Sequence, residues 1–209
     1  MKFYWIKTHA IIKKIFSSYI WCLPNNDKKI YLTFDDGPTP EITAWVLSEL
    51  EKFEAKATFF CIGKNIKQYP EIYKNILDLG HSIGNHTNNH ENGWKTSDEN
   101  YIKSIQNPVF SHQEKKLKLF RPPYGKIKYF QARKLQKLGY KIIMWDVLSA
   151  DFDTKISKSK CLENVISNIR SGSIIIFHDS EKAFSNLEYV LPKTLQFLKK
   201  NGYSCEAIT

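Results

Sequence analysis

The sequence predicts an α/β fold: a distorted parallel (β/α) barrel of about seven strands, preceded by a short N-terminal helical extension. After residue 28, short apolar runs alternate regularly with segments of helical period, and no repeat or linker interrupts them. Polar residues follow the ends of several apolar runs, as at the rim of a parallel barrel. No Gly-rich phosphate loop follows any run, which disfavours an open nucleotide-binding sheet.

Composition indicates one packed domain. The chain has 209 residues, close to the usual size of a single domain, and is 42% hydrophobic and 25% charged. The formal net charge is +10, but only Arg121, Arg133 and Arg170 are arginines. Because nucleic-acid recognition depends strongly on arginine, we expect no nucleic-acid partner and at most weak attraction to anionic surfaces. We also expect a monomer.

Seven apolar runs are predicted to be strands, and five segments with helical periodicity are predicted to be helices. The strands are residues 30–34, 57–62, 81–85, 117–120, 141–145, 173–177 and 203–208. The helices are residues 41–53, 71–79, 129–138, 160–169 and 191–200. Gly80, Gly139 and Gly202 follow three of these helices, because glycine tolerates the positive φ at a helix C-terminus.

The main domain is expected to span residues 29–209, with residues 1–28 as an amphipathic extension. One helical face carries Ile12, Ile15, Phe16 and Tyr19, which predicts a short helix. Our preferred interpretation is that this helix covers the core. The alternative is a membrane-surface anchor.

The N-terminus has no clean secretory signal, because Lys7, His9, Lys13 and Lys14 interrupt its apolar stretches. The longest uncharged run, residues 15–26, is too short to span a bilayer. We therefore expect a cytoplasmic protein without a transmembrane segment, with a non-classical export route left open.

Chemically capable side chains follow five of the predicted strands. The C-terminal ends of parallel barrel strands share one rim, so these side chains are expected to converge on one pocket. They are Asp35, Asp36, His86, Arg121, Asp146 and His178.

His86 and His90 are four residues apart, which places both imidazoles on one side if the segment is a turn of helix. With Asp36 they would form a His₂-carboxylate set that leaves one coordination position for water. Taken alone, the histidine spacing is weak evidence, and the Asp-Asp-Gly-Pro stretch at residues 35–38 also fits a plain turn.

Five motifs in a fixed order are more informative. They are TFDDGP (33–38), HTNNH (86–90), RPPYG (121–125), WDVLSADFD (145–153) and IIIFHD (174–179). Together they resemble the polysaccharide deacetylase family, the NodB-homology enzymes of carbohydrate esterase family 4, over roughly residues 29–208. The resemblance implies a NodB-like barrel and metal-dependent removal of acetyl groups from N-acetylated glycans.

The resemblance also implies roles for individual residues. Asp36, His86 and His90 would bind a divalent metal, Zn²⁺ in the first place, with Co²⁺, Ni²⁺ or Mn²⁺ as further possibilities. Asp35 would be the general base, and Arg121 would orient it.

The general acid implied by the family is His178, paired with Asp151, although the residues alone leave Asp146 open as its partner. The backbone N–H of Tyr124 would stabilise the oxyanion. Asp179, next to His178, is interpreted as structural.

The substrate pocket is expected to include Pro122, Pro123, Tyr124, Phe152 and Ile176. Phe152 and Ile176 stand where the family usually has Trp and Leu. Both keep an apolar wall for an acetyl methyl group, but the indole N–H is lost, which affects the expected substrate preference.

The expected activity is therefore N-deacetylation of acetamido sugars in a chitin, chitooligosaccharide or peptidoglycan type of glycan. One alternative is an O-acetyl esterase acting on an acetylated xylan-type glycan. The other is a catalytically silent, basic module that binds a glycan or nucleic acid.

Overall fold

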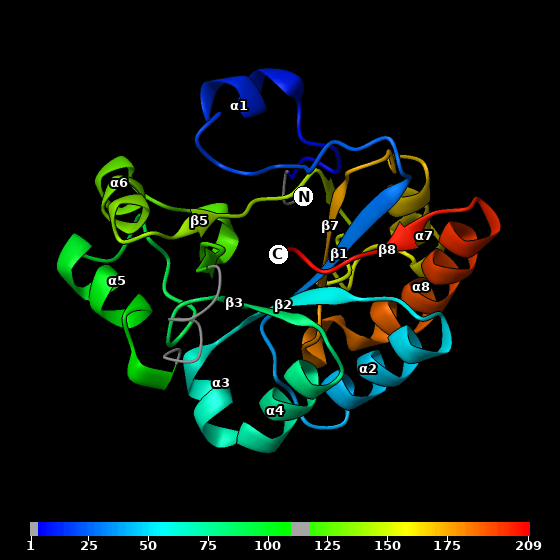
Figure 1. Cartoon of the computed structure of the whole chain (residues 1–209), viewed down its shortest axis with the longest axis horizontal. Coiled ribbons are helices and arrows are strands. Elements are labelled where there is room, and N and C mark those ends of the chain that lie inside the picture. The colour runs from blue at the N-terminus through cyan, green and yellow to red at the C-terminus, as the bar shows by residue number, and fades with distance from the viewer. Residues whose placement is uncertain (1–3, 110–117) are drawn as a thin grey trace.

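A curled sheet of parallel strands forms the centre of the computed structural model, which describes residues 4–109 and 118–209 (Figure 1). Its strands are β1 (Lys29–Asp35), β2 (Ala57–Cys61), β3 (Ser82–Asn85), β4 (Leu119–Phe120), β5 (Lys141–Ile142), β6 (Val147–Leu148), β7 (Ile174–His178) and β8 (Ser204–Cys205). Seven of them follow the order β5-β4-β3-β2-β1-β7-β6, and β8 pairs with β1. The predicted fold class, a distorted parallel barrel of about seven strands, is confirmed.

Helices surround the curled sheet on its outside (Figure 1). They are α1 (Ala10–Ile15), α2 (Ile42–Lys52), α3 (Gly63–Gln68), α4 (Pro70–Asp78), α5 (Asp98–Ile105), α6 (Tyr129–Lys137), α7 (Lys158–Ile166) and α8 (Glu181–Lys200). Gly80, Gly139 and Gly202 have φ values of 78°, 85° and 70°, which confirms the predicted helix ends. Ser97 and Ser157 cap the starts of α5 and α7.

Several elements differ from the prediction. The helices α3 and α5 and the two-residue strand β6 were not predicted, α3 and β6 because they are very short. Helix α5 did carry a signal, a buried apolar face of Tyr101, Ile102 and Ile105 after the capping Ser97, which the prediction missed. Helix α8 begins at Glu181, ten residues before the predicted start at residue 191, and continues through Pro192. The lost hydrogen bond at this proline is tolerated because the helix buries a long apolar face. Residue 117, the predicted start of the fourth strand, lies outside the described residues.

Alternate residues of β1 face two different environments. Leu32 and Phe34 are buried in the core between the sheet and the outer helices. Thr33 and Asp35 alternate with them and meet Arg121 on the inner side of the barrel. Polar side chains of β1 therefore point into the barrel, whereas the apolar side chains on its outer face form part of the main hydrophobic core.

The sheet is left open between β5 and β6, and the N-terminal segment, residues 4–23, lies along this gap. Its backbone is hydrogen-bonded to both sides of the gap, through Leu148 N to Ile6 O, Thr8 N to Asp146 O, Ile20 N to Ile142 O and Leu23 N to Gly172 O. The predicted strand 141–145 stops at Ile142 because Met144 then donates to the N-terminal segment. The extension thus completes the barrel wall.

The predicted N-terminal helix is present as α1, but its apolar face is divided. Ile12 and Tyr19 pack against the core, as expected for a helix that covers it. Ile15 and Phe16 are 65% and 45% exposed, so this part of the face has no cover within the described chain. No helix among the described residues combines the length and the apolarity needed to cross a membrane.

Asp146 fastens the N-terminal segment to the barrel. Its buried carboxylate accepts hydrogen bonds from Lys7, Lys13 and Ser173. Burial alone would raise the pKa of Asp146, but these hydrogen bonds outweigh it and hold the pKa below its ordinary value. The ionised carboxylate is therefore the form that stabilises the fold.

Replacing this carboxylate tests the attachment. We expect Asp146→Asn to lower the free energy of unfolding at pH 7 by about 1–3 kcal/mol, since two ion pairs are lost while the shape is kept. The folded-state pKa is lowered, so this stabilisation is present above the unfolded-state pKa of about 3.9 and disappears as the pH falls through the folded-state value. Urea unfolding at pH 7 and at acidic pH measures both effects.

The matched control is Asp27→Asn, which removes an exposed partner of Lys29 and should change stability little at either pH. A deficit of Asp146→Asn that stays constant as the pH falls would contradict the proposed attachment.

Candidate active site

The rim residues are brought together by strand register. Asp35 ends β1 and His178 ends β7, and the two are direct partners across these parallel strands. Residues in register on neighbouring strands point to the same face of a sheet. His86 and Arg121 follow β3 and β4 on the same rim. Residues far apart in the chain therefore meet in one site.

Asp36, His86 and His90 form a cluster of three possible metal ligands, whose ligand atoms all lie within 4.8 Å of one another. Asp36 Oδ1 lies 3.2 Å from His90 Nε2 and 3.7 Å from His86 Nε2. This carboxylate oxygen is buried without a hydrogen-bond partner among the described residues. Because a buried carboxylate oxygen needs a partner, two imidazole nitrogens and this oxygen fit a divalent cation.

The two histidines do not lie on a turn of helix, so that expectation was wrong. His86 directly follows β3, and the chain reaches His90 through a loop in which Thr87 and His90 have φ values of 65° and 60°. These left-handed residues reverse the chain, and Glu91 N donates to Thr87 Oγ1 to close the loop. The spacing of four residues brings the rings together through the loop instead.

His86 is held as a neutral imidazole. Its Nδ1 lies 2.8 Å from the carbonyl oxygen of Arg121, which only accepts hydrogen bonds, so Nδ1 carries the proton. The lone pair is then on Nε2, which faces Asp36. Burial lowers the pKa of His86 to about 4, even though Asp35 and Asp36 act in the opposite direction. The ring is thus in the form that binds metal ions.

His90 is positioned by Tyr124. The Tyr124 hydroxyl lies 3.0 Å from His90 Nδ1, and the two ring centroids are 4.5 Å apart in an edge-on arrangement. This contact leaves Nε2 of His90 directed at Asp36. The sequence indicated a backbone role and a substrate-pocket role for Tyr124, but not this side-chain contact with His90.

The turn that carries Asp36 is built around Asp179. Asp36 has a φ of 83°, and a Cβ atom on Gly37 would lie 2.0 Å from Asp179 Oδ2, so only glycine fits there. Asp179 accepts hydrogen bonds from Gly37 N and Thr43 Oγ1 at 3.1 and 2.6 Å. Burial raises the pKa of Asp179 to about 8, and the charge of Asp36 adds to this effect. These contacts agree with the structural interpretation of Asp179.

Asp35 is held by Arg121, whose side chain is completely buried. Arg121 Nη1 donates to Asp35 Oδ1 and to Thr33 Oγ1, each at 2.7 Å. Its remaining hydrogen bonds go to the carbonyl oxygens of Ile143 and Met144. The guanidinium therefore has a fixed position, and so does the carboxylate that it contacts. Thr33 was missed as part of this arrangement, because nothing in its spacing distinguishes it from other strand residues.

His178 is paired with Asp151. His178 Nδ1 lies 2.8 Å from Asp151 Oδ1, and the His178 backbone N–H donates to Asp151 Oδ2. Burial alone would lower the pKa of His178, but the Asp151 carboxylate raises it to about 9. The imidazolium is therefore the main form at neutral pH. Asp146, the partner that the residues left open, is engaged with the N-terminal segment instead.

The expected pocket residues fall into two groups. Phe152 lies edge-on to His178 with ring centroids 5.1 Å apart, so it borders the site directly. Ile176 is 3% exposed and packs in the cluster behind Phe152. Pro122 and Pro123 are also buried, and only Tyr124 of this motif is well exposed.

The backbone of Tyr124 is in a left-handed conformation, with a φ of 60°. The hydrogen bonds of its turn run from Gly125 N to Pro122 O and from Lys126 N to Pro123 O. The Tyr124 N–H takes no part in the hydrogen bonds of this turn. It belongs to the same residue whose hydroxyl contacts His90.

Fold and site together define a class of protein: a parallel barrel that carries a possible divalent-metal site, with a carboxylate and an imidazole in register on the same rim. The family model "Polysaccharide deacetylase" matches residues 23–143. The chain belongs to the polysaccharide deacetylase family.

Two relatives and one solved structure illustrate this similarity. A peptidoglycan-N-acetylglucosamine deacetylase of Bacillus cereus is 37% identical over 186 residues, which cover 88% of this chain and 87% of that protein. A chitooligosaccharide deacetylase of Azorhizobium caulinodans is 34% identical over 161 residues, which cover 75% of this chain and 76% of that protein.

The solved structure is a crystal structure of a peptidoglycan N-acetylglucosamine deacetylase in complex with 4-naphthalen-1-yl-N-oxidanyl-benzamide. It matches with a TM-score of 0.83 at 32% identity and covers 91% of each chain. Other relatives are longer, since the chain spans 62% of a second Bacillus cereus deacetylase and 37% of the Listeria monocytogenes deacetylase PgdA.

Arg121 provides a test of the site's rigidity. Lysine keeps the charge but cannot reach all four acceptors, so buried carbonyl groups lose their partners. We expect Arg121→Lys to lower the free energy of unfolding by about 2–4 kcal/mol. Denaturant unfolding measures this change, with the exposed Arg133→Lys as the control. If the two variants were equally stable, the guanidinium would not hold the site.

Proposed function

We propose that this chain is a divalent-metal-dependent hydrolase that removes N-acetyl groups from acetamido sugars of a poly- or oligosaccharide, of the peptidoglycan, chitin or chitooligosaccharide type. One observation carries the proposal: the Asp36–His86–His90 cluster, with its unsatisfied buried oxygen, lies beside Asp35 and His178. The names of the relatives support the class of substrate.

Zn²⁺ is the metal that we propose for the cluster. Two neutral imidazoles and one carboxylate suit zinc, and Co²⁺, Ni²⁺ or Mn²⁺ would fit the same donors. When bound, such a cation polarises the amide carbonyl and lowers the pKa of a nearby water molecule. Asp36, His86 and His90 would hold it, and their positions are fixed by the Gly37 turn, the Arg121 carbonyl and the Tyr124 hydroxyl respectively.

Asp35 is the proposed general base. Its Oδ1 is occupied by Arg121, while Oδ2 points toward the metal cluster, 3.8 Å from His86 Nε2. This carboxylate would take a proton from the water molecule that attacks the carbonyl carbon of the acetamido group. Arg121, which donates to Oδ1, would keep the carboxylate correctly aimed.

Two further groups would stabilise the negative charge on the carbonyl oxygen and supply a proton to the leaving nitrogen. The backbone N–H of Tyr124 would donate to the oxygen that gains negative charge, an effect worth about 3 kcal/mol for a well-placed donor. His178, which is protonated at neutral pH, would donate its Nε2 proton to the leaving nitrogen. The C–N bond breaks, water is consumed, and the products are acetate and a free amino sugar.

The expected substrate contacts and domain organisation remain part of the proposal. Phe152 and Tyr124 would contact the sugar or its acetyl group, with Ile176 and the two buried prolines shaping the wall behind them. We propose that residues 29–209 form the catalytic domain, that residues 1–28 are its N-terminal extension, whose described part from residue 4 docks against the barrel, and that the protein acts as a monomer. The hydrogen bonds along the barrel gap support the docking.

Acetate release tests the proposed reaction. The zinc-loaded protein would be assayed on N-acetylglucosamine oligomers, peptidoglycan and acetylated xylan, then again after chelation and metal addition. We expect release from the N-acetylated glycans only, loss on chelation and recovery with metal. If the folded, metal-loaded protein released acetate from none of these substrates, the proposed activity would be refuted and a catalytically silent binding module would be the remaining interpretation. Selective release of acetate from xylan would indicate an O-acetyl esterase.

The roles of the two neighbouring groups can be separated by mutation. We expect Asp35→Asn to keep its bound metal and to lose activity by at least about a thousandfold, because only the base is removed. His86→Ala should lose the metal itself. Elemental analysis and acetate release measure both properties. Equal metal content in the two variants would contradict these assignments.

The pH profile tests His178. Activity should fall as the pH rises through the pKa of His178, because the acid must be protonated. Asp151→Asn removes the charge that raises this pKa, so the alkaline limb of kcat/KM should move by at least about one pH unit to lower pH. The exposed Glu99→Gln serves as the control. An unchanged alkaline limb in Asp151→Asn would refute the role of His178.

A further inference from the structure

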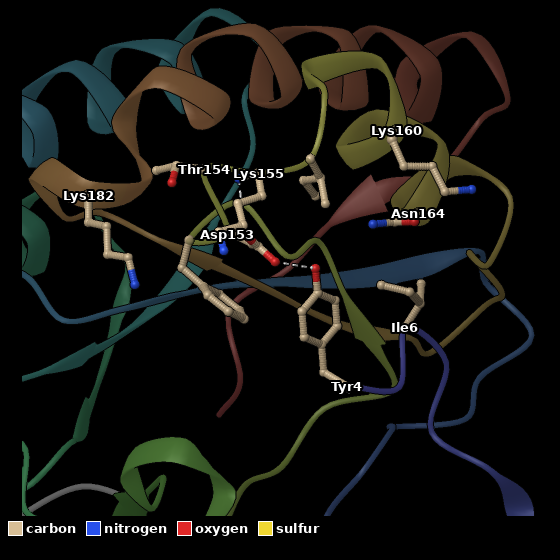
Figure 2. Close-up of a pocket in the computed structure, with 10 residues that line it drawn as sticks. Tyr4, Ile6, Asp153, Thr154, Lys155, Lys160, Asn164 and Lys182 are labelled. Atoms are coloured by element: carbon tan, nitrogen blue, oxygen red, sulfur yellow. Dashed lines mark hydrogen bonds between the residues drawn. The ribbon is translucent and has the colours of Figure 1, made fainter. Parts of the chain in front are cut away.

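A second pocket, of about 570 Å³, lies next to the proposed catalytic site. Figure 2 shows the side chains that line it. Phe152 separates it from the site, because this ring lines the pocket and also lies edge-on to His178. Tyr4 and Ile6 of the N-terminal segment contribute another part of the wall. The pocket is thus close enough for a group attached to a bound glycan to enter it.

The charged side chains in the pocket are mainly lysines. Lys155, Lys160 and Lys182 line it, together with Asp153. Asp153 is already engaged, because Oδ2 accepts from the Tyr4 hydroxyl at 2.9 Å and Oδ1 from the Lys155 backbone N–H at 3.0 Å (Figure 2). Burial, with a contribution from Asp153, raises the pKa of Tyr4 to about 12, so Tyr4 stays a neutral donor. Both carboxylate oxygens of Asp153, the acidic residue in the pocket lining, therefore accept hydrogen bonds from residues of the pocket wall.

Two of the lysines carry uncompensated charge. Lys160 pairs with Glu163 at 3.0 Å. Within residues 4–109 and 118–209, no acidic side chain lies at ion-pairing distance from the ammonium group of Lys155 or Lys182. The Lys182 ammonium lies 5.8 Å from the centre of the Phe152 ring, which is the ring that also contacts His178. Three lysines and one aspartate line the pocket, so its charged side chains are predominantly positive, and part of its wall is aromatic.

We infer that this pocket is a subsite for a carboxylate carried by the glycan near the sugar that loses its acetyl group. Lys155 and Lys182 would attract the carboxylate, and the rings of Phe152 and Tyr4 would contact the carbon chain that bears it. The inference rests on the proposed function and adds a specificity for acidic glycans.

The donor set favours a carboxylate over a phosphate. Phosphate sites usually combine arginine forks with backbone N–H groups at a helix N-terminus or in a nest. Here the donors are two ammonium groups on flexible stems, which act as point charges and suit a singly charged group. The source could be a lactyl ether on the sugar itself or a peptide attached to the glycan, and both present the same chemistry.

The test compares one variant pair on three substrates. The substrates are an uncharged N-acetylglucosamine tetramer, a tetrasaccharide that alternates N-acetylglucosamine with N-acetylmuramic acid, and the same tetrasaccharide with peptides attached. We expect Lys155→Met/Lys182→Met to lower kcat/KM about tenfold on the acidic substrates and to leave the uncharged one unchanged. The loss should be mainly in KM and should shrink at high salt. The two acidic substrates reveal which carboxylate is bound.

Lys158→Met is the matched control, because Lys158 lies on α7 as Lys160 does but pairs with Glu188 outside the pocket. If the double variant lost kcat/KM equally on charged and uncharged substrates, or on neither, the inference would be overturned. The proposed function would still stand, because acetate release by the unmodified protein tests it separately.

Calorimetric titration of the acidic tetrasaccharide into zinc-loaded Asp35→Asn, with and without the two lysine changes, reads the pocket without turnover. If no substrate released acetate but the lysines still governed this binding, the proposed function would fail and the subsite would stand. Binding that did not depend on the lysines would refute the subsite.

Discussion

The buried guanidinium of Arg121 is the interaction on which the rest of the site depends. It joins the strand that ends at Asp35 to the backbone at Ile143 and Met144, across the width of the barrel. Its own carbonyl fixes the tautomer of His86. A buried charge needs hydrogen-bond partners, and four of the five N–H donors of Arg121 have them, so the surrounding segments are constrained to one arrangement. The same residue thereby positions both Asp35 and His86.

This constraint explains how two adjacent carboxylates acquire different environments. Asp35 is satisfied by Arg121, whereas Asp36 turns away in a left-handed conformation and presents a buried oxygen to two imidazoles. The backbone at Met144 also donates to the N-terminal segment, so the segment that completes the barrel wall supports the position of Arg121. Stability of the barrel gap and order in the site are physically linked.

The sequence predicted the elements whose signals are local and strong. The long apolar runs at β1 and β2 and the glycines after three helices led to correct assignments, whereas the two residues of β6 carry no period of their own. The rim was predictable because parallel strands share one end. The path between the histidines was not, because a spacing of four residues fits a helical turn and also a loop with left-handed residues. The choice between Asp151 and Asp146 depended on lysines more than 130 positions away, which no local pattern reveals.

Anomalous diffraction from a crystal of the zinc-loaded protein, collected at the zinc absorption edge, tests the central claim most directly. We expect one strong peak bonded to Asp36 Oδ1, His86 Nε2 and His90 Nε2 at about 2.0–2.2 Å, with Asp35 and His178 on either side of its open position. A peak elsewhere, or one that contacts only one of these three residues, would contradict it.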